Sequence, residues 1–272
     1  MVYFQITPNT VLQEYVKYFW VFEGSESLSQ TSFFKIIPDG LPSLIYQDKV
    51  NMFVDENSNA LPELYIYGQF TKYSKNKVTG PFRTIGVYLE PIALKVLFGI
   101  DANEFSNLNT PLEDIIPNSI LEQLRDARSV YEKVDVLSNF LQSRLLQTKS
   151  ISQNAKWALL LLQSGKSLKE IQDEMKMSER SLERLANQHI GMSPKMYSRV
   201  MRFQSSLNLL RATDYDNLLG IALEHEYFDQ AHFNREFREF TGVTPSLFLK
   251  VMNEQLPNFP KILDENDINS VV

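Results

Sequence analysis

The sequence predicts an α+β protein, in which a β-rich, sandwich- or barrel-like N-terminal domain is followed by an all-α domain with two helix-turn-helix units. Two observations predict this architecture. Short runs of β-branched and aromatic residues fill residues 1–100, whereas apolar residues recur at helical spacings beyond about residue 117. In addition, residues 167–194 and 217–245 form an internal repeat. A chain of 272 residues is long enough for two domains of ordinary size.

The β-rich part is predicted from five short runs, which are "YFWVFEG", "FFKIIPDG", "PSLIYQ", "ELYIYGQF" and "TIGVYLE". Gly, Pro, Asp and Asn bound these runs, as is typical of strands that end at turns. The following segment, "PIALKVLFGI", predicts a short helix with Pro91 in its first turn. Leucine and valine residues between positions 121 and 145 then fall at helical spacings, so one or two amphipathic helices extend to about residue 149. Everything beyond Ile151 reads as helical.

The two copies of the repeat align almost without a gap. Ile171 corresponds to Ile221 at an offset of 50, and Arg184 corresponds to Arg235 at an offset of 51. One extra residue therefore lies in the turn of the second copy. Each copy reads as a short helix, a tight turn and a second helix, which is the helix-turn-helix unit.

Capping residues mark the ends of these helices. Ser167 and Glu170 form a capping-box pattern, and Ser178 and Asp229 stand where the N-caps of the two second helices belong. Both copies end in G-x-[ST]-P, which supplies a glycine to end one helix, a hydroxyl to cap the next and a proline for its first position. The segment between the copies, "PKMYSRVMRFQSSLNLLRA", predicts one helix of about 18 residues, or roughly 27 Å. Because two helices that read one face of B-DNA lie about 34 Å apart, this helix would be a suitable spacer.

The second helix of the second copy has two different faces. Its aromatic residues recur at i, i+4 and i+7 and predict a buried stripe. Its polar residues carry side chains that form hydrogen bonds in two directions or present a guanidinium group. The stripe consists of Phe233, Phe237 and Phe240, and the polar face consists of Gln230, Asn234 and Arg238 with His232 and Arg235 beside them.

Composition excludes some classes of protein and leaves DNA binding undecided. The chain has no cysteine, so disulfides, thiolate catalysis and cysteine-ligated metals are excluded. It has no apolar run of the 18 or so residues that a membrane span needs and no signal-peptide pattern, so we expect a cytoplasmic protein without membrane association. The net charge is −6. Basic and acidic residues number 13 and 17 over 1–149, 13 and 12 over 150–250, and 1 and 4 over 251–272, so only the middle block is not acidic.

The N-terminal half has no pattern of a metal enzyme. Residues 1–149 contain no histidine, which excludes a His-ligated metal site, and carboxylates alone would favour only hard cations. Asp39, in "PDG", is best explained as a turn residue. Aromatic residues are abundant, and they could either line an apolar ligand pocket or pack in the core, with core packing the default; they are Tyr18, Phe19, Trp20, Phe33, Phe34, Tyr46, Tyr65 and Tyr67.

The repeat resembles the DNA-binding part of the AraC family of transcription regulators. The signature IAxxxxYFDQAHFxREFxxFTGxTPSxF can be read from Ile221 to Phe248, and "MSPKMYSRVMRFQSSLNLL" fits the first copy and connecting helix, so the resemblance covers about 100 residues. In the N-terminal half, "IIPDGLPSLIY" and "GPFRTIGVYLEP" resemble the sensor-type domain of some members. The resemblance implies a sensing or dimerisation domain at 1–149 that ends in linker helices, a DNA-binding domain at 150–250 and a C-terminal tail at 251–272.

The sequence departs from the family pattern at the two turns and on the first reading helix. Lys176 and Glu226 stand where the family usually has glycine, and Gln172 replaces a small alanine. A non-glycine residue held at positive φ costs about 1 kcal/mol, so strain is expected at both turns. Glu179 and Glu183 place negative charge on the second helix of the first unit, which is its DNA-reading helix in the family and would face the phosphates of DNA. These departures weaken the DNA binding expected of the first unit more than that expected of the second.

The resemblance places the DNA contacts on the second helix of each unit. Reading helices enter the major groove by their N-terminal ends, where Arg pairs with guanine and Asn or Gln with adenine, while Ser, Arg and helix N-termini hold phosphates. Lys195 and Arg199 in the connecting helix are expected to add at most phosphate contacts. The expected DNA-binding residues are Arg180, Ser181, Arg184, Gln230, His232, Asn234 and Arg235.

The sequence therefore predicts a sequence-specific DNA-binding transcription regulator of the AraC type, and not an enzyme. Double-stranded DNA is the main implied partner; RNA polymerase, a small organic effector and a second copy of the chain are further implied partners, and no cofactor is expected. The alternative is a protein-interaction module whose degenerate helix-turn-helix units no longer bind DNA. The near-neutral middle block, the acidic first reading helix and the replaced glycines favour that alternative.

Overall fold

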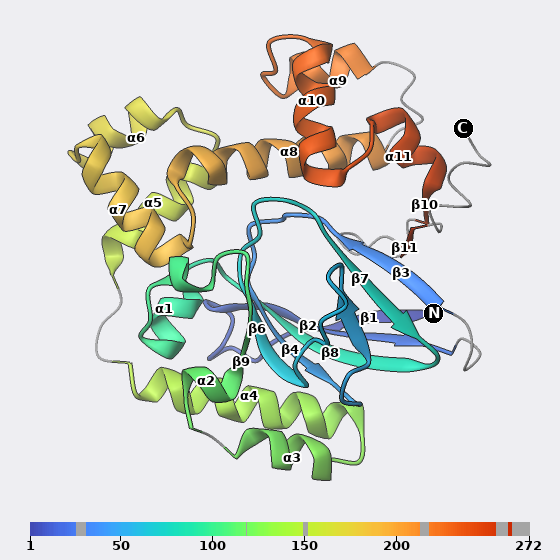
Figure 1. The fold of residues 1–272 in the computed structure, drawn as a ribbon. Coiled ribbons are helices and arrows are strands. Elements are labelled where there is room, and N and C mark those ends of the chain that lie inside the picture. The colour runs from blue at the N-terminus through green and yellow to red at the C-terminus, as the bar shows by residue number, and fades with distance from the viewer. Residues whose placement is uncertain (26–30, 118, 149–151, 213–217, 254–260, 263–272) are drawn as a thin grey trace.

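The computed structural model describes residues 1–25, 31–117, 119–148, 152–212, 218–253 and 261–262. A β-sandwich with flanking helices forms the N-terminal half, and the helices that follow lie across one end of it (Figure 1). The expected α+β architecture is thus confirmed. The boundary expected at 149/150 and most of the expected tail lie outside the described residues.

Two antiparallel sheets make up the sandwich. The six-stranded sheet has the order β1 (Val2–Ile6), β2 (Val16–Gly24), β8 (Phe82–Leu89), β4 (Ser43–Gln47), β6 (Leu64–Tyr67) and β9 (Asn109–Pro111). The five-stranded sheet has the order β10 (Met252–Asn253), β11 (Lys261–Ile262), β3 (Thr31–Ile36), β7 (Ser74–Thr79) and β5 (Phe53–Asp55). The expectation that everything beyond Ile151 is helical is therefore wrong, because β10 and β11 extend the five-stranded sheet along the free edge of β3.

Side chains alternate between two cores along the central strands. Trp20 and Phe22 of β2 pack between the sheets, whereas Phe19 and Val21 of the same strand face the helices on the other side. The core between the sheets is largely aromatic, and Gly86 of β8 lies against Trp20 so closely that a Cβ there would overlap the indole ring. Strands that are buried on both faces explain why these segments read as nearly continuous apolar runs.

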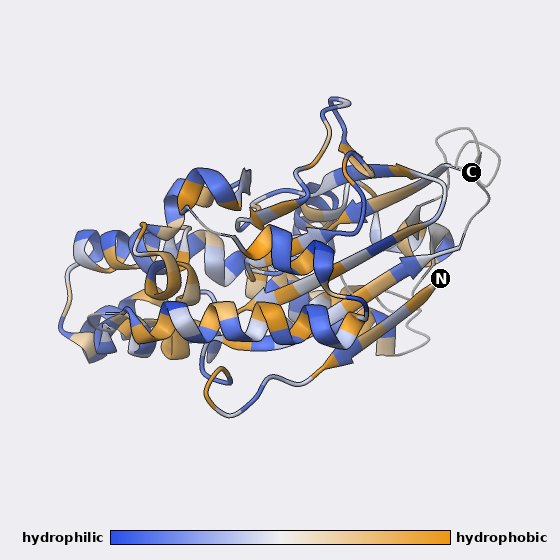
Figure 2. Ribbon diagram, turned by 90° about the horizontal axis from the view of Figure 1, so that it is seen from below, coloured by the Kyte–Doolittle hydropathy of each residue, from blue (hydrophilic) through white to orange (hydrophobic). Residues whose placement is uncertain are grey.

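The helices of the N-terminal half cover the outer face of the six-stranded sheet. They are α1 (Ala93–Phe98), the 3₁₀ turn η1 (Ala102–Phe105), α2 (Leu112–Ile115), α3 (Ile120–Asp126) and α4 (Val130–Leu146). Hydrophobic and hydrophilic residues alternate along α3 and α4, which are nearest the viewer in Figure 2. The expected short helix after Pro91 and the expected amphipathic helices up to about residue 149 are confirmed by α1, α3 and α4.

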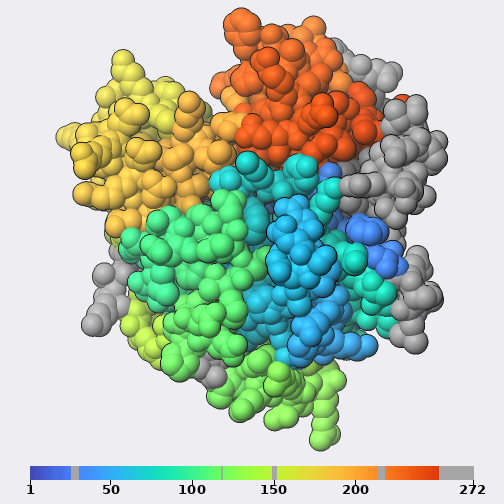
Figure 3. Space-filling model, in the orientation of Figure 1, coloured from blue at the N-terminus to red at the C-terminus, as the bar shows by residue number. Residues whose placement is uncertain are grey.

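The second half consists of α5 (Gln153–Gln163), α6 (Leu168–Met175), α7 (Glu179–Ile190), α8 (Pro194–Ala212), α9 (Leu218–Glu224), α10 (Gln230–Thr241) and α11 (Pro245–Val251). These helices share one apolar core, which also takes in Ile37 and Ile92 from the N-terminal half. In the space-filling view, α5–α7 and α9–α11 form two lobes above the sandwich (Figure 3). Among the described residues, no helix combines the length and the apolar character that crossing a membrane requires.

Candidate nucleic-acid interface

Both helix-turn-helix turns have the backbone geometry that their sequence departures predicted. Lys176 ends α6 with φ of 52°, and Glu226 has φ of 57° in the turn between α9 and α10. Both residues therefore occupy the left-handed region, where glycine is favoured. The side chain of Ser178 accepts a hydrogen bond from the Ser181 amide at 3.3 Å and so caps α7. Asp229 caps α10 in the same way, by accepting from the His232 amide at 2.6 Å.

The reading helices α7 and α10 end as the repeat predicted. Gly191 ends α7 with φ of 93°, and Gly242 ends α10 with φ of 75°. The next helices begin at Pro194 and Pro245, and Ser193 caps α8 by accepting from the Met196 amide at 3.2 Å. The two units therefore have the same local construction at both ends of their reading helices.

The apolar stripe of α10 packs in the helical core. Phe233, Phe237 and Phe240 are fully buried, and Phe203 of α8 packs on the second and third of these rings with centroids 5.5 and 4.9 Å away. This packing turns the opposite face of α10 to the exterior. On α7, Leu182 and its apolar neighbours have the corresponding role.

Four of the seven expected DNA-binding residues are exposed, namely Arg180 and Arg184 on α7 and Gln230 and Arg235 on α10. They lie in the N-terminal parts of their helices, from which base edges in a major groove are read. Among the interactions of the described residues, the side chains of these four have no hydrogen bond or ion pair, so they are available to a ligand.

The other three residues are partly buried, and two of them have local structural contacts. Ser181 shares a 3.0 Å hydrogen bond with Ser178. The ring of His232 accepts a hydrogen bond from the Phe228 amide through Nδ1 at 3.4 Å and meets the Tyr227 ring edge-on. Asn234 is partly buried, and its Oδ1 is covered without a hydrogen-bond partner among the described residues. Pairing of an Asn side chain with adenine would need both of its amide atoms, and Oδ1 of Asn234 is covered, whereas the side chain of Gln230 is exposed.

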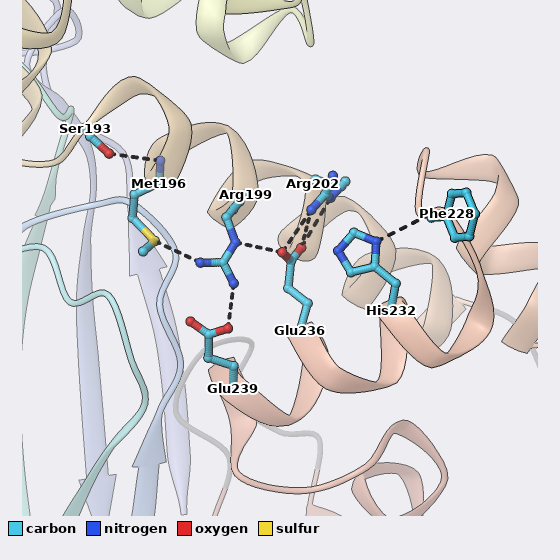
Figure 4. A network of polar contacts seen from close by, with 8 residues as sticks. All are labelled: Ser193, Met196, Arg199, Arg202, Phe228, His232, Glu236 and Glu239. Atoms are coloured by element: carbon cyan, nitrogen blue, oxygen red, sulfur yellow. Dashed lines mark hydrogen bonds and ion pairs between the residues drawn. The ribbon is translucent and has the colours of Figure 1, made fainter.

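An ion-pair network joins the spacer helix to the second reading helix (Figure 4). Glu236 of α10 is 3% exposed, and its carboxylate accepts from Arg199 Nε at 2.8 Å and from Arg202 Nη2 at 2.8 and 2.9 Å. Arg199 also donates to Glu239 at 2.6 Å. Burial alone would lower the pKa of Arg199, but its hydrogen bonds to Glu239 and Glu236 outweigh burial and raise that pKa. Arg199 therefore has a structural role, and its expected phosphate contact stays a prediction.

Sequence reasoning missed Glu236, although the signal was present. Positions 233, 236, 237 and 240 are i, i+3, i+4 and i+7 of one helix, so Glu236 is a charged residue within the apolar stripe. A carboxylate is stable in such a place only with a cationic partner. The arginine partners lie on another helix, and their identity could not be read from α10 alone.

The charge of the interface is mixed. Glu179 and Glu183 are exposed on α7 beside Arg180 and Arg184. A groove of about 680 Å³ runs between the two units. Its basic lining residues are Lys166 of the first unit and Lys195, Arg199 and Arg202 of α8, and its acidic ones, Glu224, Glu226 and Glu236, all belong to the second unit. Burial lowers the pKa of both His189 and His225, which favours their neutral forms.

The N-terminal candidates have structural roles. Asp39 accepts a hydrogen bond from the Leu41 amide at 3.0 Å, as expected for a turn residue. Of the eight aromatic residues named from the sequence, Tyr18 and Phe33 are partly buried and the others are buried in the cores. Within the part of the chain that the structure describes, no three His, Cys, Asp or Glu side chains are grouped to hold a metal ion.

Two capped helix-turn-helix units in tandem, joined by one helix and sharing one core, define an AraC-type helix-turn-helix domain. Residues 171–250 match the model of a family described as a helix-turn-helix domain, and residues 4–111 match that of a domain of unknown function. An uncharacterized HTH-type transcriptional regulator of Haemophilus influenzae is 28% identical over 167 residues, which are 54% of this chain and 56% of that protein. The chain thus spans about half the length of the curated relative that it matches.

Solved structures with a similar arrangement include ToxT of Vibrio cholerae. One ToxT structure covers 85% of this chain and 98% of its own, with 12% sequence identity and a TM-score of 0.45. A ToxT structure with bound unsaturated fatty acid covers 90% of this chain and 96% of its own, with 15% identity and a TM-score of 0.44.

Proposed function

We propose that this protein binds double-stranded DNA sequence-specifically and regulates transcription. The observation that carries the proposal is the tandem geometry: each unit has a capped reading helix with free, exposed polar residues near its N-terminus. The spacer α8 has 19 residues and is thus about 28 Å long, which suits two helices that enter successive major grooves about 34 Å apart. The proposed role is regulatory and not enzymatic.

The exposed residues have different proposed roles. The guanidinium groups of Arg180, Arg184 and Arg235 can donate two hydrogen bonds to a guanine edge, and the amide of Gln230 can pair with adenine. Ser178 and Asp229 cap the N-termini of α7 and α10, where backbone amides concentrate positive potential for phosphates. Ser181 and His232 are proposed to assist mainly by fixing the first turns of the reading helices, and Asn234 is proposed as a further base contact.

The N-terminal domain is proposed to act as a sensor or dimerisation domain. Its aromatic interior and its lack of histidine favour a small organic effector held by aromatic and backbone groups. The linker helix α4 leaves Tyr131 67% and Leu146 88% exposed, which supports pairing with a second copy of the chain. RNA polymerase is a further proposed partner, by resemblance to the family.

A protein-interaction module without DNA binding is the second candidate. The exposed Glu179 and Glu183 on α7 favour it, because they would face the phosphates of a bound duplex. Arg199 and Arg202 also favour it, because their charge is balanced by Glu236 and Glu239.

Selection of bound sequences from a random duplex pool, followed by titration of Arg235→Ala, separates the two candidates. On the selected site Arg235→Ala should weaken binding by about 1–3 kcal/mol and relax preference at one or two base positions. Arg128→Ala is the matched control, since Arg128 is also exposed but precedes α4 in the N-terminal half. If the wild type binds selected and scrambled duplexes alike, or binds neither at about 50 mM salt, the interaction module is the better assignment.

A further inference from the structure

Both reading helices end against the N-terminal domain, at the same position of the repeat. At the first, Ser106 donates a hydrogen bond through Oγ to the carbonyl of Gly191. Gly191 is packed so tightly that a Cβ would overlap Gln69 Oε1 and lie 3.0 Å from the Ala102 carbonyl oxygen. The end of α7 therefore fits onto η1 and the loop after β6.

The second reading helix is held by strand β3. Lys35 of this strand is 4% exposed, and its ammonium donates to the carbonyl of Thr241 at 2.6 Å. A Cβ on Gly242 would lie 2.7 Å from the ring of Tyr73 and 3.0 Å from Lys35 Nζ. The backbone of β3 also pairs with β11, which belongs to the segment after α11. The second unit is thus attached to β3 both through Lys35 and through added strands.

The spacer helix is held between these two points. Gln204 donates to the carbonyl of Pro38 at 2.6 Å, and Gly40 lies so close to Tyr197 and Met201 of α8 that a Cβ would be 3.0 and 2.9 Å from their side chains. Gln69 lies at both contacts. Its Nε2 donates a hydrogen bond to the carbonyl of Gly40 at 3.1 Å, and its Oε1 lies against Gly191.

We propose that the N-terminal domain sets the distance and angle between the two reading helices, and so determines which spacing of half-sites the protein accepts. This inference rests on the proposed DNA binding. One folded sandwich contacts the glycine end of each reading helix and the spacer between them. A change in the separation of α7 and α10 would break the contact at Gly191 or that at Gly242. Breaking the contact at Gly242 also takes the carbonyl of Thr241 away from the buried ammonium of Lys35, which is unfavourable.

The test compares binding to the selected site with binding to the same site lengthened by one base pair between its half-sites. In Lys35→Met the apolar stem stays and the hydrogen bond to Thr241 is lost, and Ser106→Ala removes the bond to Gly191. Lys77→Met is the matched control, since Lys77 is exposed on the neighbouring strand β7. Wild type and Lys77→Met should bind the lengthened site about tenfold or more weakly, by analogy with a mismatched base pair. In Lys35→Met and Ser106→Ala, the ratio of the affinity for the selected site to that for the lengthened site should fall to a few-fold.

Amide exchange of the segment 237–248 provides a readout without DNA. Exchange there should accelerate in Lys35→Met and stay at the wild-type rate in Lys77→Met. The inference is overturned if wild type discriminates between the two sites and both interface variants keep the same ratio, or if exchange does not change in Lys35→Met. Failure of the proposed function is distinguishable, because in that case wild type itself would bind no duplex specifically.

Discussion

At the scale of single residues, the two turns of the repeat are held in a conformation that their side chains disfavour. Lys176 and Glu226 both have positive φ although each carries a Cβ. The turns keep this shape because the residues after them must begin α7 and α10 at fixed places against the shared core. Local strain is thus maintained by burial of the apolar stripes on both sides.

Replacing Glu226 by glycine should stabilise the protein. Glycine adopts positive φ without strain, so Glu226→Gly is expected to raise the free energy of unfolding by up to about 1 kcal/mol. Denaturant midpoints of the two proteins provide the measurement. Glu224→Gly is the control, because Glu224 is the last residue of α9 and glycine in a helix should lower stability. A clear loss of stability in Glu226→Gly would contradict the strained-turn account.

At the scale of elements, a buried carboxylate joins α10 to α8. Glu236 is held by two guanidinium groups of α8, and those groups also stack on rings of the second unit. Arg202 lies 4.4 Å from the centroid of Tyr227, and Arg199 lies 5.2 Å from that of Phe240. The network therefore combines ion pairs with aromatic contacts at one helix crossing.

Neutralising Glu236 should have a much larger effect than neutralising its neighbour. Glu236→Gln leaves the partly buried guanidinium of Arg202 without a carboxylate and that of Arg199 with Glu239 alone. It should lower the free energy of unfolding by about 2 kcal/mol or more. Glu239→Gln removes an ion pair of a residue whose side chain is 42% exposed, so its effect should stay below about 1 kcal/mol. Urea unfolding measures both. Equal effects of the two variants would show that Glu236 does not order this crossing.

At the scale of the whole molecule, the two halves should unfold together. Their cores are continuous, because Ile37 and Ile92 of the N-terminal half belong to the helical core. The sequence has two tryptophans, and Trp20 lies between the sheets while Trp157 lies on α5, so each half contains one fluorescent probe.

Single-tryptophan variants test this coupling. Trp20→Phe leaves the probe of the helical half, and Trp157→Phe leaves that of the sandwich. In each variant, the unfolding midpoint from tryptophan fluorescence should coincide with the midpoint from circular dichroism of the same variant, as two-state unfolding requires. Separate midpoints for the two halves would mean that the contacts at Gly191, Gly242 and α8 do not couple them.

Short-range features of this protein were predictable from its sequence. The repeat, the N-caps at Ser178 and Asp229, and the glycine ends at Gly191 and Gly242 all follow from residues within a few positions of each other. The apolar stripe of α10 was predictable for the same reason, since helical periodicity is a local property. Which reader residues are free was less predictable, because the contacts of His232 and the covered Oδ1 of Asn234 depend on side-chain packing.

By itself, the sequence determined the β-rich and helical halves, the tandem units and the strained turns. Hydrogen bonds and backbone preferences over a few residues specify these features. Only the tertiary structure decided the partners of Glu236, the addition of β10 and β11 to the sheet and the support of both reading helices by the sandwich. These contacts join residues that are far apart in the chain, such as Lys35 and Thr241, which are 206 positions apart. No local pattern encodes such pairs, since they form only when burial of the shared cores has brought the two halves together.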